Sequence, residues 1–482
     1  MGQSLKDKTV KGVFWSGIDR FSSRGIQFLF SILIARVLTP NEFGTIAILE
    51  VFLALSSTII DSGFGQALIR KQNRTDEDIN TVFYFNIVVA IIMYLILWIC
   101  APLIASYYKN PLLIKILRVV GFSLVINSFG CIQTALITIE VNFKVFARIS
   151  IVNAIVSGFV CLILAHKGFG VWALVCQTMI SSIIYNFMIW MSSTWRPSLK
   201  YSWRSFREMF SYGSRLLVTG IVNSLYRNIY TLVIGRVYKA SDLGEFSKAS
   251  NFANFPANNI AGILGSVTFP VLSKVNEDVS VIKNHYRRLL KVSSFAIFPA
   301  MIGLAAVAAP LVNVLMTDKW AGMIPFMQIF CFAYMWQAVE TIDGNLIKVL
   351  GRTDYILRLE TIKKIIGIVA LCVTVKMGMM AMCWGCFAVV PTSLVMDAYF
   401  TKRLIGYGIW DMVKDIFPIF LLSALMGLIV LSVGSLIPGD MLRLIIGVVL
   451  GILVYGGGAY LFKFPELFDF FDMLKIKRTN HE

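Results

Sequence analysis

The stretch IARVLTPNEFG at residues 34–44 recurs 200 residues later as IGRVYKASDLG at residues 234–244. In each copy an apolar run ends near an arginine, a short polar loop follows, and a new apolar run begins after an acidic residue. A weaker repeat relates residues 136–148 to residues 346–358. The spacing predicts two parallel halves with the same orientation, which is typical of transporters that bind their substrate between the halves.

The composition predicts that both halves lie in a membrane. Hydrophobic residues make up 57% of the 482 residues and charged residues 15%, against about 45–50% and 25% in soluble domains. About fourteen helices of roughly 20 residues each would use up this apolar stock. No long polar stretch remains for a soluble enzyme or a membrane-anchored soluble domain. The apolar segments are 12–37, 43–69, 80–106, 112–138, 146–166, 169–191, 211–237, 243–271, 288–316, 322–349, 358–378, 380–402, 412–436 and 441–463.

The segments and the repeat together predict the domain organisation. We expect an all-α polytopic membrane protein of about 14 transmembrane helices, built as two repeated six-helix bundles and two further helices. The first bundle would span residues 1–195, a cytoplasmic linker 196–210 and the second bundle 211–405. Residues 406–482 would hold the last two helices and a short basic tail.

The basic residues set the expected orientation. The chain carries a net charge of +17, and its lysines and arginines are spread between apolar segments rather than clustered on one soluble face, so we expect no nucleic-acid partner. Alternate loops hold roughly 25 basic residues against 7 in the other set. The positive-inside rule then predicts a multi-pass protein with both termini in the cytoplasm.

The first apolar segment contains unusual polar residues. Arg20, Arg24 and Gln27 are spaced i, i+4 and i+7, which puts them on one helix face. At about 1.5 Å per residue, Arg24 lies roughly 18 Å into the segment. Ionisable residues at that depth are costly in lipid and usually serve function. We therefore predict that these three side chains line a substrate cavity.

The seventh segment repeats the pattern. Asn223 and Arg227 are spaced i, i+4, with Asn228 alongside. Gln27 and Arg227 occupy equivalent positions under the 200-residue offset. We predict that these side chains also face the cavity, whereas the alternative is an ordinary hydrogen bond between helices.

The eighth segment is rich in asparagine around Pro256. A proline frees a backbone carbonyl and can bend a membrane helix, and a broken helix often lines a cavity. We predict that amides here contact hydroxyl groups of the substrate, although asparagines can also satisfy the freed backbone. The candidate substrate-binding asparagines are Asn251, Asn254 and Asn258.

Acidic residues allow two interpretations. Asp61, Glu340 and Asp343 are candidates for an ion-coupling site, or else they form ordinary ion pairs with Lys348, Lys363 or Lys364. Near the repeated loops, we expect Arg36 with Glu42, and Arg236 with Asp242, to clasp adjacent helices. The three histidines are too few and too scattered for a metal site, and we expect neither a metal nor a cofactor.

Several segments together resemble a known family. These are residues 35–44, 61–65, 67–69, 168–175 and 195–197. The chain resembles the polysaccharide flippases of the multidrug/oligosaccharidyl-lipid/polysaccharide exporter superfamily, in particular the lipopolysaccharide and teichuronic-acid exporter branch. The resemblance runs over nearly the whole chain and is clearest over residues 30–240.

The resemblance implies a fold and a function. It implies that the two bundles form a V around a central cavity and work by alternating access. The implied substrate is a polyprenyl-diphosphate-linked oligosaccharide, moved from the inner to the outer leaflet of the bacterial cytoplasmic membrane. The implied partners are this lipid-linked oligosaccharide and membrane lipids, with a polysaccharide polymerase and glycosyltransferases as candidates.

Two other functions compete with the flippase. A drug or cation antiporter of the same fold would need a cavity dominated by carboxylates, yet the deep charges are mainly arginine. A membrane glycosyltransferase, polymerase or ligase would need a catalytic acidic cluster or a large loop. The sequence offers neither, nor a phosphate-cradling glycine loop, so we expect no enzyme.

Overall fold

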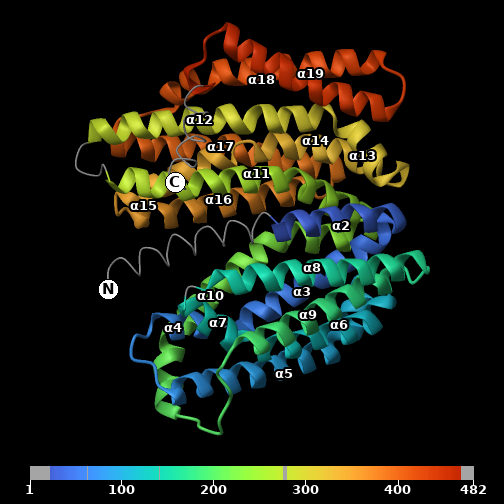
Figure 1. Cartoon of the computed structure of the whole chain (residues 1–482), viewed down its shortest axis with the longest axis vertical. Coiled ribbons are helices and arrows are strands. Elements are labelled where there is room, and N and C mark those ends of the chain that lie inside the picture. Colours follow the sequence, from blue (N-terminus) through green and yellow to red (C-terminus); the bar gives the residue numbers. More distant parts are fainter. Residues whose placement is uncertain (1–21, 62, 141, 275–278, 468–482) are drawn as a thin grey trace. The chain divides into compact units, whose positions relative to one another are not determined.

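The computed structural model describes residues 22–61, 63–140, 142–274 and 279–467. Within these ranges all regular secondary structure is helical (Figure 1), which confirms the predicted all-α class. Contacts divide the chain into two compact units, residues 1–244 and 245–482.

The described part of the first unit contains nine complete helices, of which α5 packs on α6, α8 on α9, and α2 on α8 (Figure 1). Helix α10 packs on α3, α4 and α5 of this unit, although the sequence repeat assigns it to the second half. The described helices are α2 (Arg24–Val37), α3 (Pro40–Asp61), α4 (Phe64–Arg70), α5 (Asp76–Tyr107), α6 (Leu112–Phe129), α7 (Cys131–Ile139), α8 (Phe143–His166), α9 (Val171–Ser192) and α10 (Trp203–Val237).

Helix α11 begins in the first unit and continues into the second. In the second unit α12 packs on α18 and α14, while α17 packs on α16 and α14. The elements are α11 (Ala240–Lys274), α12 (Val279–Ala306), α13 (Ala308–Met316), η2 (Asp318–Trp320), α14 (Met323–Tyr334), α15 (Gln337–Val349), α16 (Thr353–Thr374), α17 (Met379–Ile405), α18 (Ile409–Leu436) and α19 (Asp440–Leu461).

Nine helices in the described ranges are long and apolar enough to cross a membrane. The chain is therefore a multi-pass membrane protein, while the count of fourteen stays a prediction. Helices α10 and α11 are long enough, at 35 residues each, but are not among the nine. These two helices carry the candidate arginine and asparagines, so the residues that suggest a site also lower the apolar character of the helix.

Four segments that we expected as single helices are each two helices. The chain breaks between α3 and α4, between α6 and α7, between α12 and α13, and between α14 and α15. At the first break Gly63 has a φ of 71°, a conformation that residues with a Cβ atom rarely adopt. In contrast, α11 continues through Pro256 without the break that we considered.

The helix ends agree with the predicted repeat at its first junction. Helix α2 ends at Val37 and α3 begins at Pro40, while α10 ends at Val237 and α11 begins at Ala240. The acidic residue of each copy caps the following helix. The backbone N–H of Thr39 donates to Glu42 at 2.6 Å, and that of Lys239 donates to Asp242 at 3.2 Å.

The predicted contact between Arg236 and Asp242 does not form. Arg236 instead donates to the backbone carbonyl of Tyr107 at 2.5 Å, and its guanidinium lies 4.6 Å from the centre of the Tyr107 ring. The arginine therefore holds the end of α10 against the end of α5, and Asp242 is left to cap α11.

The two copies of the repeat meet at their glycines. A Cβ atom built on Gly44 would overlap the carbonyl oxygen of Ala240, and one built on Gly244 would overlap that of Pro40. Each built Cβ would also lie 3.0 Å from the backbone nitrogen of the other glycine. The starts of α3 and α11 can cross this closely only because neither glycine has a side chain.

This crossing predicts that Gly44→Ala and Gly244→Ala each destabilise the protein. Overpacking of this kind typically costs about 1–3 kcal/mol, and we expect a lower apparent melting temperature of the purified protein in detergent. The matched control is Gly434→Ala in α18, where an added Cβ has no neighbour within 4 Å. Unchanged melting of both crossing variants would contradict the close approach.

The last two helices are tightly joined to the second unit. Asp415 of α18 accepts two hydrogen bonds from Arg287 of α12 and one of 2.9 Å from the Tyr407 hydroxyl. Lys291 of α12 lies 3.4 Å from the same carboxylate. In α19 the Tyr455 hydroxyl donates to the carbonyl of residue 295 at 2.9 Å. Although they lie outside the repeat, both helices belong to the packed core of this unit.

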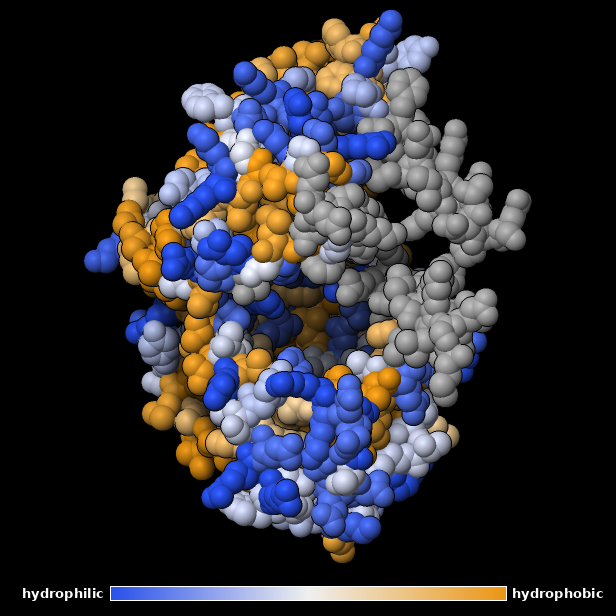
Figure 2. Space-filling model, turned by 90° about the vertical axis from the view of Figure 1, so that its left-hand side faces the viewer, coloured by the Kyte–Doolittle hydropathy of each residue, from blue (hydrophilic) through white to orange (hydrophobic). Residues whose placement is uncertain are grey.

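Ion pairs join the loop after α4 to α5 and α10 at one end of the first unit. Lys71 lies 3.0 Å from the Asp78 carboxylate and 3.1 Å from that of Glu208 on α10. Burial acts to lower the pKa of Lys71, but the hydrogen bonds and charges of the two carboxylates outweigh it and raise the pKa. Figure 2 shows hydrophilic side chains gathered over this end. Its exposed residues include Arg70, Gln72, Asn73, Arg204 and Arg207.

Candidate functional site

Helix α2 presents one polar face. Arg24 and Gln27 are exposed, while Phe30 and Ile34 are buried against α8 and α9. This division follows from the sequence, because apolar residues fill the packed face of the helix. Arg20 lies outside the described residues, so the predicted triplet is described only at Arg24 and Gln27.

Helix α10 carries Arg227, which is exposed, and Asn223 and Asn228, which are half-buried. The Asn228 amide donates to the Ser224 carbonyl of its own helix at 2.8 Å. Part of its hydrogen-bonding capacity is therefore used locally. Neither Arg24 nor Arg227 has an ion-pair or hydrogen-bond partner among the described residues. Within the described ranges, no protein group therefore neutralises these two guanidinium groups.

The three candidate asparagines of α11 differ in their surroundings. Asn251 is exposed. The carbonyl oxygen of the Asn254 side chain is buried and accepts no hydrogen bond from the described residues. The Asn258 side chain accepts from Gln337 of α15 at 2.7 Å. All three lie in the second unit, whereas Arg24, Gln27 and Arg227 lie in the first.

The acidic candidates also differ in burial and in hydrogen-bond partners. Asp61 is exposed at the end of α3, with the Cys131 thiol 3.8 Å from its carboxylate. Asp343 is buried and accepts hydrogen bonds from the Tyr286 hydroxyl at 2.5 Å and the Thr401 hydroxyl at 3.3 Å. Ion coupling at Asp61, Glu340 or Asp343 stays a prediction.

Lys363 of α16 holds two carboxylates together. Its ammonium lies 2.8 Å from the buried Asp397 of α17 and 3.6 Å from Glu340 of α15. The lysine therefore joins three helices of the second unit. An ion pair with Glu340 is among the ordinary pairings that the sequence suggested.

We predict that Lys363→Met destabilises the protein. Removal of one partner from a buried pair leaves an uncompensated charge at a typical cost of about 3–5 kcal/mol, so the apparent melting temperature should fall clearly. The control is Lys348→Met, which changes an exposed lysine of α15. Equal melting of the two variants would contradict the role of Lys363 in packing.

Sequence reasoning missed several ionisable residues within helices. Glu50 is exposed in α3, Lys248 is buried in α11, and Asp397 is buried in α17. Each is a charged residue within a largely apolar segment, which is the signal that identified Arg24 and Arg227. The same signal is therefore present in the sequence at these three residues.

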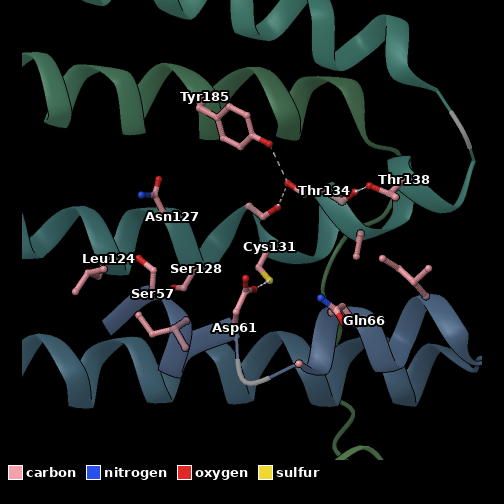
Figure 3. A pocket seen from close by; sticks show the side chains of 16 residues that line it. Ser57, Asp61, Gln66, Leu124, Asn127, Ser128, Cys131, Thr134, Thr138 and Tyr185 are labelled. Atoms are coloured by element: carbon pink, nitrogen blue, oxygen red, sulfur yellow. Dashed lines mark hydrogen bonds between the residues drawn. The ribbon is translucent and has the colours of Figure 1, made fainter. Parts of the chain in front are cut away.

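The first unit contains a half-open pocket of about 380 Å³, lined by both polar and apolar residues, that the sequence did not predict (Figure 3). It lies where two helices break, between α3 and α4 and between α6 and α7, with Tyr185 of α9 beside it. Its lining residues are Ser57, Ile60, Asp61, Gly63, Gly65, Gln66, Ile69, Leu124, Asn127, Ser128, Gly130, Cys131, Thr134, Ala135, Thr138 and Tyr185.

The candidate arginines and asparagines can bind charged and hydroxyl-bearing ligands. The exposed guanidinium groups favour anionic ligands such as phosphates, and amide side chains can both donate to and accept from hydroxyl groups. Among the described residues, no group of three histidine, cysteine or acidic side chains is arranged to hold a metal ion.

Comparison with known proteins identifies relatives across most of the chain. The model of a family described as polysaccharide biosynthesis protein matches residues 33–325. The lipopolysaccharide biosynthesis protein WzxC of Escherichia coli (strain K12) is 25% identical, over 78% of this chain and 77% of that protein. The succinoglycan biosynthesis transport protein ExoT of Rhizobium meliloti (strain 1021) is also 25% identical, over 69% and 68%.

A solved structure shares the fold. The lipid II flippase MurJ, in an inward closed conformation, superimposes with a TM-score of 0.76 at 16% identity and covers 93% of this chain and 98% of its own. Such a match at low identity shows a common architecture. It agrees with the helical membrane fold expected from the sequence.

Proposed function

We propose that this chain, which belongs to the polysaccharide biosynthesis protein family, transports a lipid-linked oligosaccharide across the bacterial inner membrane. The substrate would be a polyprenyl diphosphate carrying a short oligosaccharide, moved from the cytoplasmic to the outer leaflet by alternating access. The names of WzxC and ExoT, and the flippase that shares the fold, support a transport role in polysaccharide assembly.

The observation that carries this proposal is the exposure of two arginine side chains, Arg24 and Arg227. Arg24 and Arg227 are exposed on helices of a membrane protein, without an ion-pair partner among the described residues. A charge at membrane depth is costly unless a ligand or water-filled space receives it. A diphosphate supplies two acidic groups that guanidinium groups bind well. Cationic drugs would be repelled by the same arginines.

The transport mechanism follows from this chemistry. Binding of the diphosphate and sugars replaces water around charged and hydroxyl groups, while the lipid tail stays in the bilayer. The chain needs no catalytic group for this exchange, and we propose that it is not an enzyme. We propose the lipid-linked oligosaccharide and membrane lipids as its partners, with glycosyltransferases acting before transport and a polymerase after it.

Removal of either arginine should impair transport. Each charge-assisted contact contributes about 1.5–3 kcal/mol, so Arg24→Ala or Arg227→Ala should slow flipping roughly 10- to 100-fold. The assay uses purified protein in liposomes with a polyprenyl-diphosphate oligosaccharide and an impermeant glycosidase outside. The control is Arg215→Ala, an exposed arginine nearer the start of α10. Wild-type rates in both variants would contradict the arginine site, and no flipping by wild type would contradict the function.

The orientation can be tested independently. We predict that impermeant thiol reagents applied outside cells label Asn41→Cys and Lys239→Cys but not Lys200→Cys. These exposed residues lie in the 39–42, 238–242 and 196–206 segments. The unmodified chain, with its eight native cysteines, sets the background. The reverse labelling pattern would overturn the proposed cytoplasmic location of both termini.

A further inference from the structure

The pocket of the first unit combines polar groups from several helices. Ser57, Asp61, Gln66 and Asn127 are all exposed, and all four line it. Asp61 ends α3, Gln66 lies on α4 and Asn127 lies on α6. Figure 3 shows these side chains around a common space, with Tyr185 on the opposite wall from Asp61. A ligand here would therefore meet a carboxylate, two amides and hydroxyl groups at once.

The hydrogen bonds that the pocket already makes leave capacity for a ligand. The Asn127 carbonyl oxygen accepts from Asn186 at 3.0 Å, which leaves the Asn127 amide hydrogens as donors. The hydroxyl groups of Thr134 and Tyr185 lie 3.2 Å apart and share a hydrogen bond. Among the described residues, the hydrogen-bond partner of Asp61 is the Cys131 thiol, a weak donor. A charged acceptor and an amide donor are thus open to the pocket.

The position of the pocket also points to a ligand. Two helices are interrupted beside it, at Gly63 and at Gly130. In transporters, interrupted helices occur where backbone lines a cavity or a binding site. The break at Gly63 has a φ of 71° and depends on a glycine.

The charge and size of the pocket narrow the choice of ligand. None of the described residues that line it is basic, and Asp61 is the one acidic residue among them. A phosphate would therefore meet repulsion rather than a partner. Its volume of about 380 Å³ is far larger than a metal ion needs and lies at the small end of organic ligand sites.

From this geometry we infer that the pocket binds one sugar ring of the substrate, and that the ring is neutral or carries an amine. Sugar hydroxyls donate to the Asp61 carboxylate and accept from the Asn127 and Gln66 amides. Asp61 makes the pocket select against uronic acids and other carboxylate-bearing sugars, since like charges placed together are costly. The sugar assignment rests on the proposed transport of a lipid-linked oligosaccharide, whereas the pocket chemistry does not.

The experiment measures sugar binding directly. Saturation-transfer NMR on the full-length protein in detergent uses three probes: methyl glucoside, methyl glucosaminide and methyl glucuronide. We expect signals from the first two and a weak signal from the glucuronide. Ser57→Leu, which fills the pocket, should abolish the signals, whereas the exposed Ser435→Leu of α18 should not. Equal signals in the two leucine variants, or no signal from any probe in the wild type, would overturn the inference.

A second variant changes the charge and keeps the volume. Asp61→Asn should raise the glucuronide signal about tenfold relative to the glucoside, because it removes the like charge. An unchanged ratio would overturn the selectivity. The Asp61→Asn measurement tests the inference even if Ser57→Leu fails to fold.

Flipping in liposomes then separates the two proposals. If the probes bind as expected but no lipid-linked oligosaccharide is flipped, the proposed function fails and the pocket stands. If the wild type flips its substrate and Asp61→Asn leaves the probe ratio unchanged, the pocket assignment fails and the function stands.

Discussion

Charged side chains in a chain this apolar must find partners in the protein, in water or in a ligand, and this requirement organises the structure. In the second unit the buried carboxylates have partners: Asp343 accepts from two hydroxyl groups, Asp397 pairs with Lys363, and Asp415 pairs with Arg287. These contacts join α12, α15, α16, α17 and α18. In the first unit Arg24 and Arg227 are exposed without an ion pair among the described residues. Lys71 of the first unit also pairs with Asp78 and Glu208, whereas Arg24 and Arg227 are the charges that we propose bind a ligand.

Much of the architecture could be predicted because it follows from composition and repetition. The apolar content predicted membrane helices. The repeat predicted that the loop between α10 and α11 lies at the position equivalent to the loop between α2 and α3, and the helix ends agree. The helix breaks could not be predicted in the same way. The chain has 35 glycines, and nothing in the local sequence distinguishes Gly63, whose φ is positive, from glycines inside helices. Tertiary contacts decide which glycine ends a helix.

The candidate site was predictable only in part, for a similar reason. An arginine in an apolar run is conspicuous, so Arg24 and Arg227 could be found from spacing alone. Serine, threonine and asparagine are less informative, because in helices they often bond their own backbone, as Thr134 does with the Gly130 carbonyl. Which of them face a pocket depends on how helices pack. The pocket beside Asp61 therefore appeared only in three dimensions.

Because α3 and α11 cross at Gly44 and Gly244, the two repeats cannot accept substitutions independently at these positions. Repeats that arise by duplication can usually diverge separately, since a change in one copy leaves the other intact. Here the backbone of each copy occupies the space that a side chain of the other would need. Neither position can accept a larger residue while the partner helix stays in place. A chimaera that joins one repeat to a half from another transporter would therefore have to inherit a compatible glycine at the junction, however well the rest of its helices matched.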